Sequence, residues 1–449
     1  MNKRILLPLL AGILLTGFAA SAQDNTTDEY VWPSDQAVLQ KLQDWQDLKF
    51  GVILHWGLYS VPGIVESWNL CNESWVVRPE GSTYEGYKQW YWGLAKDFNP
   101  VDFDPEQWAK VFDDAGMKYI IFTTKHHDGY CLFDSEYTDF SSAKGPAGKD
   151  FVKPVFDTFR GHGYMIGEYF SKPDWHYPGY WNPYYATPNR HFNYEQKMHP
   201  DWWESYVNYT RNQIGEITGG RYGNIDILWL DGGWVSGDEI GLGSLVPEIR
   251  RNNPGIIIVD RMIGGENENY QTPERTFPAR QIMHPWESCI PLSDDWGWTP
   301  GHRYKSARQI IATLVQIVAK GGNFVVGIGP TPQGLIDDDA VAILSEVGAW
   351  LKVNGAAIYG TRPTPVFNDG GSVWFTASKD GRTRYAIYAP WDDGAAPETL
   401  TWTGNIPSGK VRMLGSGKRL RAKVSGNQVT VRLPKGMKNE AFALEFNCK

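Results

Sequence analysis

The chain has 449 residues and a formal net charge of −8, so it is too long for one ordinary small domain. No basic stripe stands out, and nucleic acid and anionic membrane surfaces are therefore not expected as partners. Some of the 21 Trp and 23 Tyr residues must fill the core, and a surplus of this size also suits sugar binding, because an indole face packs against the apolar C–H face of a pyranose.

The N-terminus has the pattern of a targeting segment. Lys3 and Arg4 give a short positive region, residues 5–15 are mostly apolar, and Ala20-Ser-Ala22 offers a small-residue cleavage site. This pattern predicts a secretory signal peptide over residues 1–22, with cleavage near Ala22 and a secreted or periplasmic product. No other stretch has the length and apolarity of a membrane span.

The four cysteines, at positions 71, 131, 289 and 448, show no C-x-x-C spacing. A structural zinc site is therefore not expected. Cys131 and Cys289 lie inside apolar and aromatic segments, which predicts buried thiols at both positions.

Strand and helix patterns alternate along the first three quarters of the chain. A helix is predicted over residues 34–48, and a buried strand then runs from Phe50 to His55. The following strands are predicted over residues 119–129, 164–169, 225–231, 256–261, 281–285 and 323–328. Helices are predicted over residues 104–115, 151–161, 202–217, 245–251 with Pro247 in the first turn, 303–320 and 337–353.

This alternation predicts a parallel sheet wound with helices. Several strands end in polar or aromatic residues on their carboxyl side, namely His55, His126, Tyr169, Asp231 and Arg261. An open sheet usually draws on fewer strands near one switch point, so contributions from so many favour a (β/α)8-like (TIM) barrel over residues 23–362. No clear eighth strand is visible, and an irregular barrel is expected.

The texture changes after residue 362. Short strands over residues 373–377, 384–388, 411–414 and 429–433 are separated by Gly, Pro, Asn and Asp at roughly regular intervals. This pattern predicts a C-terminal antiparallel β-sandwich over residues 363–449.

Asp231 ends the apolar run that begins at Ile225, and two glycines follow it. The residue suits either a tight turn or helix cap, or a catalytic group at a strand terminus. Glycoside hydrolysis needs two carboxyl groups, and Asp231 is the candidate nucleophile. Glu274 and Glu287 are both candidates for the acid/base, since each has apolar neighbours that would raise its pKa, although either carboxylate could instead make a structural hydrogen bond.

The run His126-His127-Asp128 could bind a metal, form a buried histidine pair, or donate hydrogen bonds to ligand hydroxyls. Adjacent residues point in opposite directions along a strand, and no third ligand appears at standard spacing. The hydroxyl-binding interpretation is therefore preferred, and no metal is expected.

Several motifs together resemble the α-L-fucosidases of glycoside hydrolase family 29, over about residues 45–363. They are His55-Trp-Gly, Glu66-Ser-Trp68, Lys125-His-His-Asp-Gly129, Leu228-Trp-Leu-Asp-Gly232, Asp260-Arg261, Trp286-Glu-Ser-Cys289, Trp296-Gly-Trp298, Gly321-Gly-Asn323, Gly329-Pro330, Asn354-Gly355 and Ile358-Tyr-Gly-Thr-Arg-Pro363.

The resemblance implies an exported, retaining exo-α-L-fucosidase that acts on a fucosylated oligosaccharide or glycoconjugate without a metal or organic cofactor. Asp231 matches the family nucleophile, Glu274 is the expected acid/base, and Glu287 is the fallback. Sugar contacts carry over to His55, Glu66, His126, His127, Tyr169, Trp229 and Arg261, with Trp68, Trp296 and Glu287 as further pocket residues.

Two departures from the family pattern put substrate preference in question more than reaction type. Gly327 stands where the family often has Asn, and Ala356 stands where Glu is common. The alternatives to a fucosidase are a related exo-glycosidase, such as an α-L-galactosidase, and a catalytically degenerate carbohydrate-binding protein.

Overall fold

The structure, a computed structural model, describes residues 26–187 and 189–448. The predicted signal peptide, residues 1–22, lies outside the described residues. Among the described residues, no helix combines the length and the apolarity needed to cross a bilayer.

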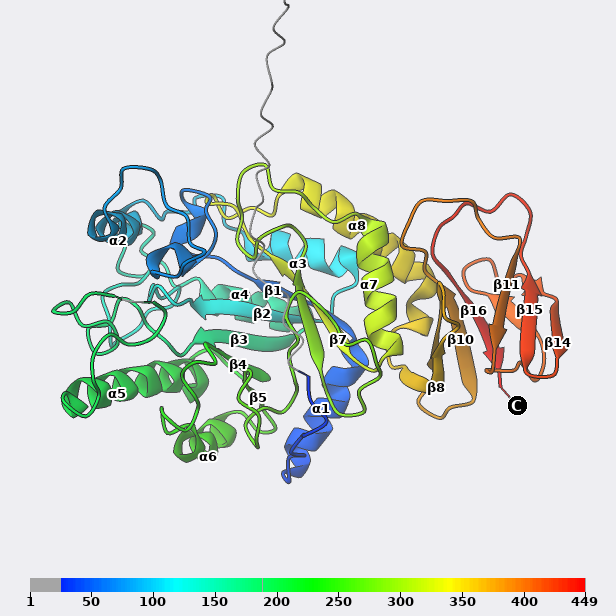
Figure 1. Cartoon of the computed structure of the whole chain (residues 1–449), viewed down its shortest axis with the longest axis horizontal. Coiled ribbons are helices and arrows are strands. Elements are labelled where there is room, and N and C mark those ends of the chain that lie inside the picture. Colours follow the sequence, from blue (N-terminus) through cyan, green and yellow to red (C-terminus); the bar gives the residue numbers. More distant parts are fainter. Residues whose placement is uncertain (1–25, 188, 449) are drawn as a thin grey trace, which may run out of the picture.

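The N-terminal part is built on a curled parallel sheet in the order β5-β4-β3-β2-β1-β7-β6 (Figure 1). Nearly every residue of these strands is buried, because helices cover the outer face and side chains fill the inner one. The strands are β1 (Phe50–Leu54), β2 (Tyr119–Lys125), β3 (Met165–Ser171), β4 (Ile227–Asp231), β5 (Ile257–Asp260), β6 (Glu287–Pro291) and β7 (Asn323–Ile328).

Helices on the outside connect most of these strands, and short helical turns lie in the loops or directly continue a helix. The helices are α2 (Tyr84–Gly93), α3 (Pro105–Ala115), α4 (Val152–Gly161), α5 (Pro200–Glu216), α6 (Leu242–Asn252), α7 (Ala307–Ala319) and α8 (Asp338–Asn354). The turns are η1 (Leu58–Ser60), η2 (Ser67–Leu70), η3 (Leu94–Lys96), η4 (Ile217–Arg221) and η5 (Gly355–Ala357).

The first helix, α1 (Gln36–Leu48), closes the N-terminal end of the barrel. Asp35 caps it by accepting hydrogen bonds from two backbone N–H groups of the first turn. Val38, Leu42 and Trp45 lie on one face and join the side chains that fill the barrel interior. Trp45 stacks on Tyr270 with ring centroids 4.2 Å apart.

The gap between edge strands β5 and β6 is spanned by residues 268–275, which take the place of a regular eighth strand. On one side, the Asn269 N–H donates to Ile258 O at 2.8 Å. On the other side, isolated parallel bridges join Gln271 to Trp286 and Glu274 to Cys289. Pro273 has no N–H to donate, which helps to explain why this segment forms bridges and no continuous ladder.

Two sequence predictions about this half were wrong in detail. The predicted sixth strand over residues 281–285 is an irregular bend, and β6 begins only at Glu287. Helix α6 begins at Leu242, three residues earlier than expected, so Pro247 lies in its second turn. Another residue at position 247 would donate its N–H to the carbonyl oxygen of Gly243, but proline has no N–H. The apolar pattern did not indicate that Gly243 belongs to the helix.

The C-terminal part is an antiparallel sandwich. A six-stranded sheet, in the order β13-β12-β16-β10-β9-β8, packs on a three-stranded sheet in the order β11-β15-β14. Phe375, Trp402 and Val429 are buried between the two. The strands are β8 (Arg362–Asn368), β9 (Val373–Ala377), β10 (Thr383–Tyr388), β11 (Thr399–Thr403), β12 (Val411–Met413), β13 (Arg419–Leu420), β14 (Ala422–Ser425), β15 (Gln428–Arg432) and β16 (Phe442–Asn447).

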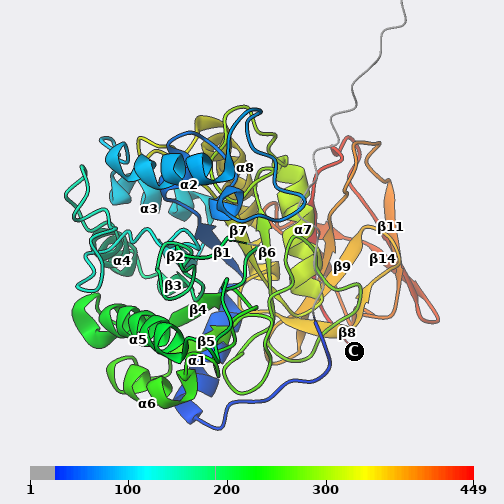
Figure 2. The same ribbon diagram turned by 60° about the vertical axis from the view of Figure 1, so that its left-hand side comes forward.

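Helices α7 and α8 connect the barrel to the sandwich, and both views show α7 between the two sets of strands (Figures 1 and 2). The Trp350 indole donates to Ala441 O at 2.9 Å, and the Ala443 N–H donates to Asn354 Oδ1 at 3.0 Å. The predicted fold class, a (β/α)8-like barrel followed by a β-sandwich, is confirmed. So are buried thiols at Cys131 and Cys289, and the cysteines among the described residues are all free.

Candidate active site

The polar residues predicted to serve catalysis meet at the carboxyl ends of the barrel strands. His55 follows β1, the histidine pair follows β2, Asp231 ends β4, and Arg261 follows β5. Tyr169 lies on β3 two residues before Ser171, so both side chains point into the barrel. Because parallel strands place their carboxyl ends at one edge, residues far apart in the sequence form one pocket.

Arg261 joins the two carboxylates at the centre of this site. One guanidinium nitrogen donates to Asp231 Oδ1 at 2.9 Å, and another donates to Glu274 Oε2. The guanidinium also lies over the Trp229 ring, 4.8 Å from its centroid. The side chain of Arg261 is 8% exposed, so little water competes with these contacts.

Asp231 is held as a carboxylate. Burial by itself would raise its pKa, but the Arg261 charge and a hydrogen bond from Tyr169 together hold the pKa well below its usual range. The Tyr169 hydroxyl donates to Asp231 Oδ2 at 2.5 Å. An ionised, positioned carboxylate at a strand terminus is the form that a nucleophile requires.

Glu274 lies on the segment that closes the barrel. The Trp296 indole donates to its Oε1 at 3.2 Å, and its side chain is 21% exposed. Glu274 therefore faces the same pocket as Asp231, with access to solvent. Trp296 in turn packs on His55, with ring centroids 5.1 Å apart.

Glu287 lies elsewhere. It is the first residue of β6, at the N-terminal end of the barrel, and it is completely buried. Burial raises its pKa to about 8, although a hydrogen bond from the Tyr119 hydroxyl, 2.6 Å long, partly opposes that shift. Tyr119 begins β2, so Glu287 belongs to the barrel floor and has no contact with Asp231 or Glu274 among the described polar interactions.

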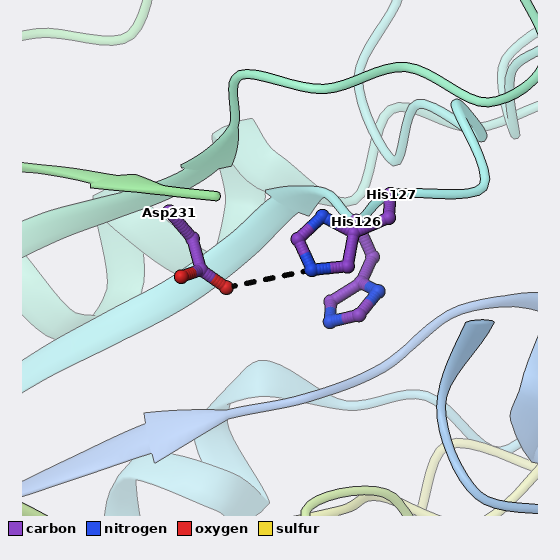
Figure 3. A group of neighbouring side chains, drawn as sticks. All are labelled: His126, His127 and Asp231. Atoms are coloured by element: carbon purple, nitrogen blue, oxygen red, sulfur yellow. Dashed lines mark ion pairs between the residues drawn. The ribbon is translucent and has the colours of Figure 1, made fainter. Parts of the chain in front are cut away.

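The histidine pair does not lie on a strand, and the expectation that the two rings point in opposite directions is wrong. Strand β2 ends at Lys125, and the chain turns immediately afterwards. The rings of His126 and His127 lie side by side, with centroids 4.4 Å apart, next to Asp231 (Figure 3).

His126, His127 and Asp231 could in principle offer three ligand atoms to a metal ion, all within 4.8 Å of one another. The carboxylate, however, already accepts from Arg261 and Tyr169. A cation at this position would be repelled by the adjacent guanidinium and would compete for the same oxygens. This donor set suits a sugar hydroxyl better than a metal.

Burial keeps the histidines neutral. It lowers the pKa of His126 to about 4, partly opposed by Asp231, and it lowers the pKa of His55 and His127 well below the usual value. The Nδ1 atom of His126 contacts Ser67 Oγ. The three rings are therefore hydrogen-bonding groups and carry no fixed charge at neutral pH.

Glu66 and Trp68 complete two walls of the site. Glu66 Oε1 accepts from the Gly297 N–H at 2.7 Å, and burial raises its pKa to about 7. Trp68 packs against His127 with centroids 5.2 Å apart, and the Arg190 guanidinium lies 4.8 Å from its ring centre.

Some residues of the site were not recognised in the sequence. They are Ser67 and Ser171 beside the histidines, Trp175 and Arg190 around Trp68, and Arg275 beside Glu274. Ser171 carried a usable signal, because its spacing from Tyr169 places both on the inner face of one strand. Arg190 carried none, since it comes from an irregular loop.

Comparison with known proteins finds α-L-fucosidases that match most of the chain. The plasma α-L-fucosidase of Homo sapiens is 29% identical over 436 residues, which cover 92% of this chain and 90% of that protein. The α-L-fucosidase isoenzyme 1 from Paenibacillus thiaminolyticus superposes with a TM-score of 0.78 at 29% identity, covering 92% of this chain and all of that one. The Thermotoga maritima α-fucosidase in complex with fucose superposes with a TM-score of 0.75 at 27% identity, over 93% of this chain and all of that one.

The family model described as α-L-fucosidase matches residues 17–356, which is about three quarters of the chain and includes every strand of the barrel. The match therefore includes Asp231, Arg261 and Glu274. The chain belongs to the α-L-fucosidase family of glycoside hydrolases.

Proposed function

We propose that the protein is an exo-acting, retaining α-L-fucosidase that releases terminal L-fucose from fucosylated oligosaccharides or glycoconjugates. The observation that carries this proposal is the pair of carboxylates, Asp231 and Glu274, held by the guanidinium of Arg261. A retaining mechanism needs two carboxyl groups roughly 5 Å apart. Two carboxylates that share one guanidinium are close neighbours of this kind.

The reaction proceeds in two displacements. In the first, an Asp231 oxygen bonds to the anomeric carbon while the glycosidic bond breaks, and the Glu274 carboxyl gives its proton to the leaving oxygen. In the second, Glu274 takes a proton from water, the water oxygen bonds to the anomeric carbon, and Asp231 leaves as a carboxylate. Both Glu274 oxygens accept N–H bonds here, so sugar binding has to free one of them from Arg261 or Trp296.

The remaining residues of the pocket hold the sugar. His55, His126 and His127 offer ring nitrogens to hydroxyl groups, Glu66 offers a carboxyl oxygen, and Trp68 and Trp296 offer flat apolar faces. Fixing the ring in this way aligns the anomeric carbon with Asp231 and lowers the entropic part of the barrier. We also propose export to the periplasm or beyond, which rests on the N-terminal targeting pattern.

The decisive experiment is hydrolysis of an aryl α-L-fucoside by wild type, Asp231→Ala and Glu274→Ala, with and without azide. Azide takes the empty place in Asp231→Ala and displaces the aryl group directly, so we expect β-fucosyl azide. In Glu274→Ala the fucosyl-enzyme still forms and azide then replaces water, so we expect α-fucosyl azide and a loss of about 10²–10⁴-fold without it.

Glu287→Gln is the matched control, because it removes a buried carboxylate of the barrel floor whose hydrogen bond comes from Tyr119 and not from Asp231 or Glu274. We expect it to keep most of its activity and to show no azide effect. An α-fucosyl azide product from Glu287→Gln would overturn the assignment of Glu274. If the wild type cleaves an aryl α-L-galactoside but no fucoside, the substrate assignment is wrong. If it cleaves neither, the protein is better explained as a carbohydrate-binding protein.

A further inference from the structure

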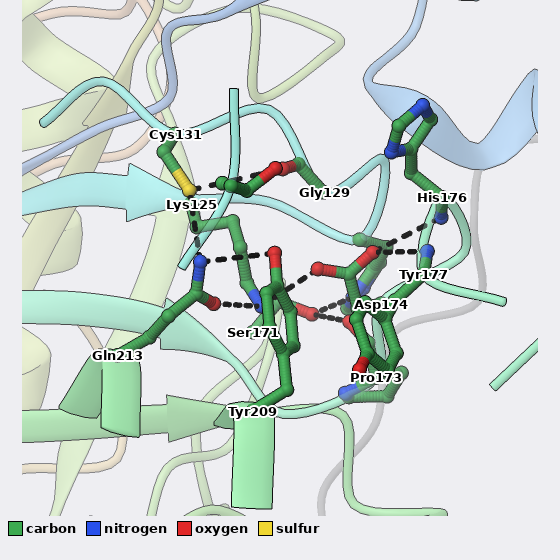
Figure 4. A network of polar contacts seen from close by, with 12 residues as sticks. Lys125, Gly129, Cys131, Ser171, Pro173, Asp174, His176, Tyr177, Tyr209 and Gln213 are labelled. Carbon is green, nitrogen blue, oxygen red and sulfur yellow. Dashed lines mark hydrogen bonds and ion pairs between the residues drawn. The ribbon is translucent and has the colours of Figure 1, made fainter. Parts of the chain in front are cut away.

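The Nδ1 atom of His127 is held by a short chain of hydrogen bonds that no catalytic step requires. It lies 2.5 Å from Ser171 Oγ, which lies 2.7 Å from the carbonyl oxygen of Pro173. Figure 4 shows Ser171 turned toward Pro173 within a dense polar network. All three residues are buried.

The direction of this chain follows from the chemistry of its last member. A carbonyl oxygen can only accept, so the single proton of the Ser171 hydroxyl is donated to Pro173. The Ser171 oxygen then accepts from His127, whose Nδ1 must carry a proton. The opposite arrangement, with Ser171 donating to Nδ1, would leave the buried Pro173 carbonyl without this donor, and such a loss is costly.

A neutral imidazole carries one proton, and with that proton on Nδ1 the Nε2 atom has a free lone pair. Nε2 lies 3.7 Å from Asp231 Oδ2, beyond hydrogen-bonding distance. Two acceptors therefore face the same point of the pocket. A hydroxyl group can donate its proton to either of these two acceptors, whereas a further acceptor at this point would be repelled.

We propose that Ser171 is a positioning residue that fixes the proton of His127 on Nδ1, so that Nε2 accepts a hydrogen bond from a hydroxyl of the bound sugar. The identity of the hydroxyl bearer rests on the proposed function, whereas the tautomer does not. With the proton on Nε2 instead, His127 would turn an N–H toward Asp231. Nε2 could then no longer accept a hydrogen bond from a hydroxyl of the sugar.

The backbone on which this chain depends is firmly anchored. Lys125 and Asp174 form a completely buried ion pair with an N–O distance of 3.0 Å. Asp174 also accepts from the backbone N–H groups of His176 and Tyr177, which fixes the turn after Pro173 (Figure 4). The Trp175 N–H donates to His127 O at 2.8 Å, so the same turn holds the histidine backbone.

The direct test is the protonation pattern of His127 in the wild-type protein, read from side-chain nitrogen shifts after labelling its nine histidines with nitrogen-15. The His127 signals are those that disappear in His127→Gln. We expect a protonated Nδ1 and an unprotonated Nε2 without any sugar. A protonated Nε2 in the wild type overturns the proposal, whatever the enzyme's activity.

Two variants separate positioning from general stability. In Ser171→Ala we expect the His127 signals to shift toward the other tautomer and kcat/KM to fall on the order of 10- to 100-fold, as for partners that orient metal-bound histidines. Ser142→Ala is the matched control, because buried Ser142 also donates to a backbone carbonyl, that of Lys149, at 2.8 Å. It should change neither the tautomer nor kcat/KM.

A panel of L-fucose analogues, each with one hydroxyl replaced by fluorine, gives a second measurement, because fluorine cannot donate. For the hydroxyl that meets Nε2, wild type should bind the fluoro analogue about 10-fold or more weakly than fucose, and Ser171→Ala should reduce that ratio. An unchanged ratio in Ser171→Ala, or an unchanged tautomer, overturns the proposed role of Ser171. Failure of the fucosidase assignment would appear as no binding of fucose at all.

Discussion

At the scale of single residues, the site depends on which donors bond to each of the two carboxylates. Asp231 accepts from Arg261 and Tyr169, and Glu274 accepts from Arg261 and Trp296. None of these contacts is local in sequence. Asp231, which has a depressed pKa, and Glu274, which is open to solvent, therefore differ because of their neighbours. Those neighbours are far away in the sequence.

Gly327 provides a test at this scale. A Cβ atom at this position on β7 would overlap the ring of Trp296, which donates to Glu274. Asn at this position should push Trp296 away from Glu274 and His55, so we expect Gly327→Asn to lower kcat/KM for an aryl fucoside by about 10-fold or more. The overpacking should cost about 1–3 kcal/mol of stability.

The matched control is Gly161→Ala, since a Cβ there meets nothing within 4 Å. Its kinetics and thermal midpoint should stay close to those of wild type. If Gly327→Asn has wild-type kcat/KM, the packing of Trp296 is not what orients Glu274. The absence of a side chain at 327, noted in the sequence as a departure from the family pattern, would then have no catalytic meaning.

At the scale of elements, the sequence predicted the regular parts and failed at the irregular ones. Buried apolar runs such as Ile225–Asp231 predicted six of the seven barrel strands, because strands covered on both faces read as continuous hydrophobic sequence. Residues 281–285 were predicted as a strand too, but they form an irregular bend. Residues 268–275 complete the barrel with Asn, Gln, Thr and Pro, and they are held by isolated bonds that leave no periodic pattern.

The candidate site follows the same division. Residues at the ends of clear strands, such as Asp231 and Arg261, could be chosen from pattern alone. Glu274 and Glu287 could not be separated, because which carboxylate faces the pocket depends on the path of the irregular segment. Arg190 comes from an irregular loop, and its guanidinium lies over the rings of Trp68 and Trp234, which are distant from it in the sequence.

Asn269 is the natural probe of the irregular segment. Its side-chain oxygen accepts from the Ile258 N–H at 2.9 Å and its side-chain amide donates to Glu266 O at 3.0 Å, which ties the segment to β5. We expect Asn269→Ala to lower stability by about 1–3 kcal/mol, because buried partners lose their bonds. We also expect a lower kcat, because Glu274 lies five residues farther along the segment.

Asn253→Ala is the matched control. Asn253 is equally buried and its side-chain oxygen also accepts a strand N–H, from Ile225 at 2.8 Å, but at the N-terminal end of the barrel. Chemical denaturation should show similar losses for the two variants, and only Asn269→Ala should change kcat. If both variants lower kcat equally, the loss follows from reduced stability of the protein, and the segment does not specifically position Glu274.

At the scale of the whole molecule, buried ionisable groups at the two ends of the barrel oppose each other as pH changes. His126 has a folded pKa of about 4 against an ordinary value of 6.5, so the unfolded chain binds a proton that the folded one does not. Its contribution to stability is complete above pH 6.5 and is lost as pH falls toward about 4, by about 3 kcal/mol. Glu287 behaves in the opposite way, since its pKa rises from 4.5 to about 8.

The protonated form of Glu287 is the one that the barrel floor accommodates. Its contribution is therefore complete below pH 4.5 and is lost as pH rises through about 8, by up to about 5 kcal/mol. Glu287→Gln keeps the shape and removes the titration. Thermal midpoints measured across pH should fall on the alkaline side in wild type and fall much less in Glu287→Gln, while the acidic limb, to which His126 contributes, stays the same in both. Parallel alkaline limbs would mean that Glu287 is already ionised in the folded protein at neutral pH, and the polar floor around Tyr119 would then have to stabilise a buried charge.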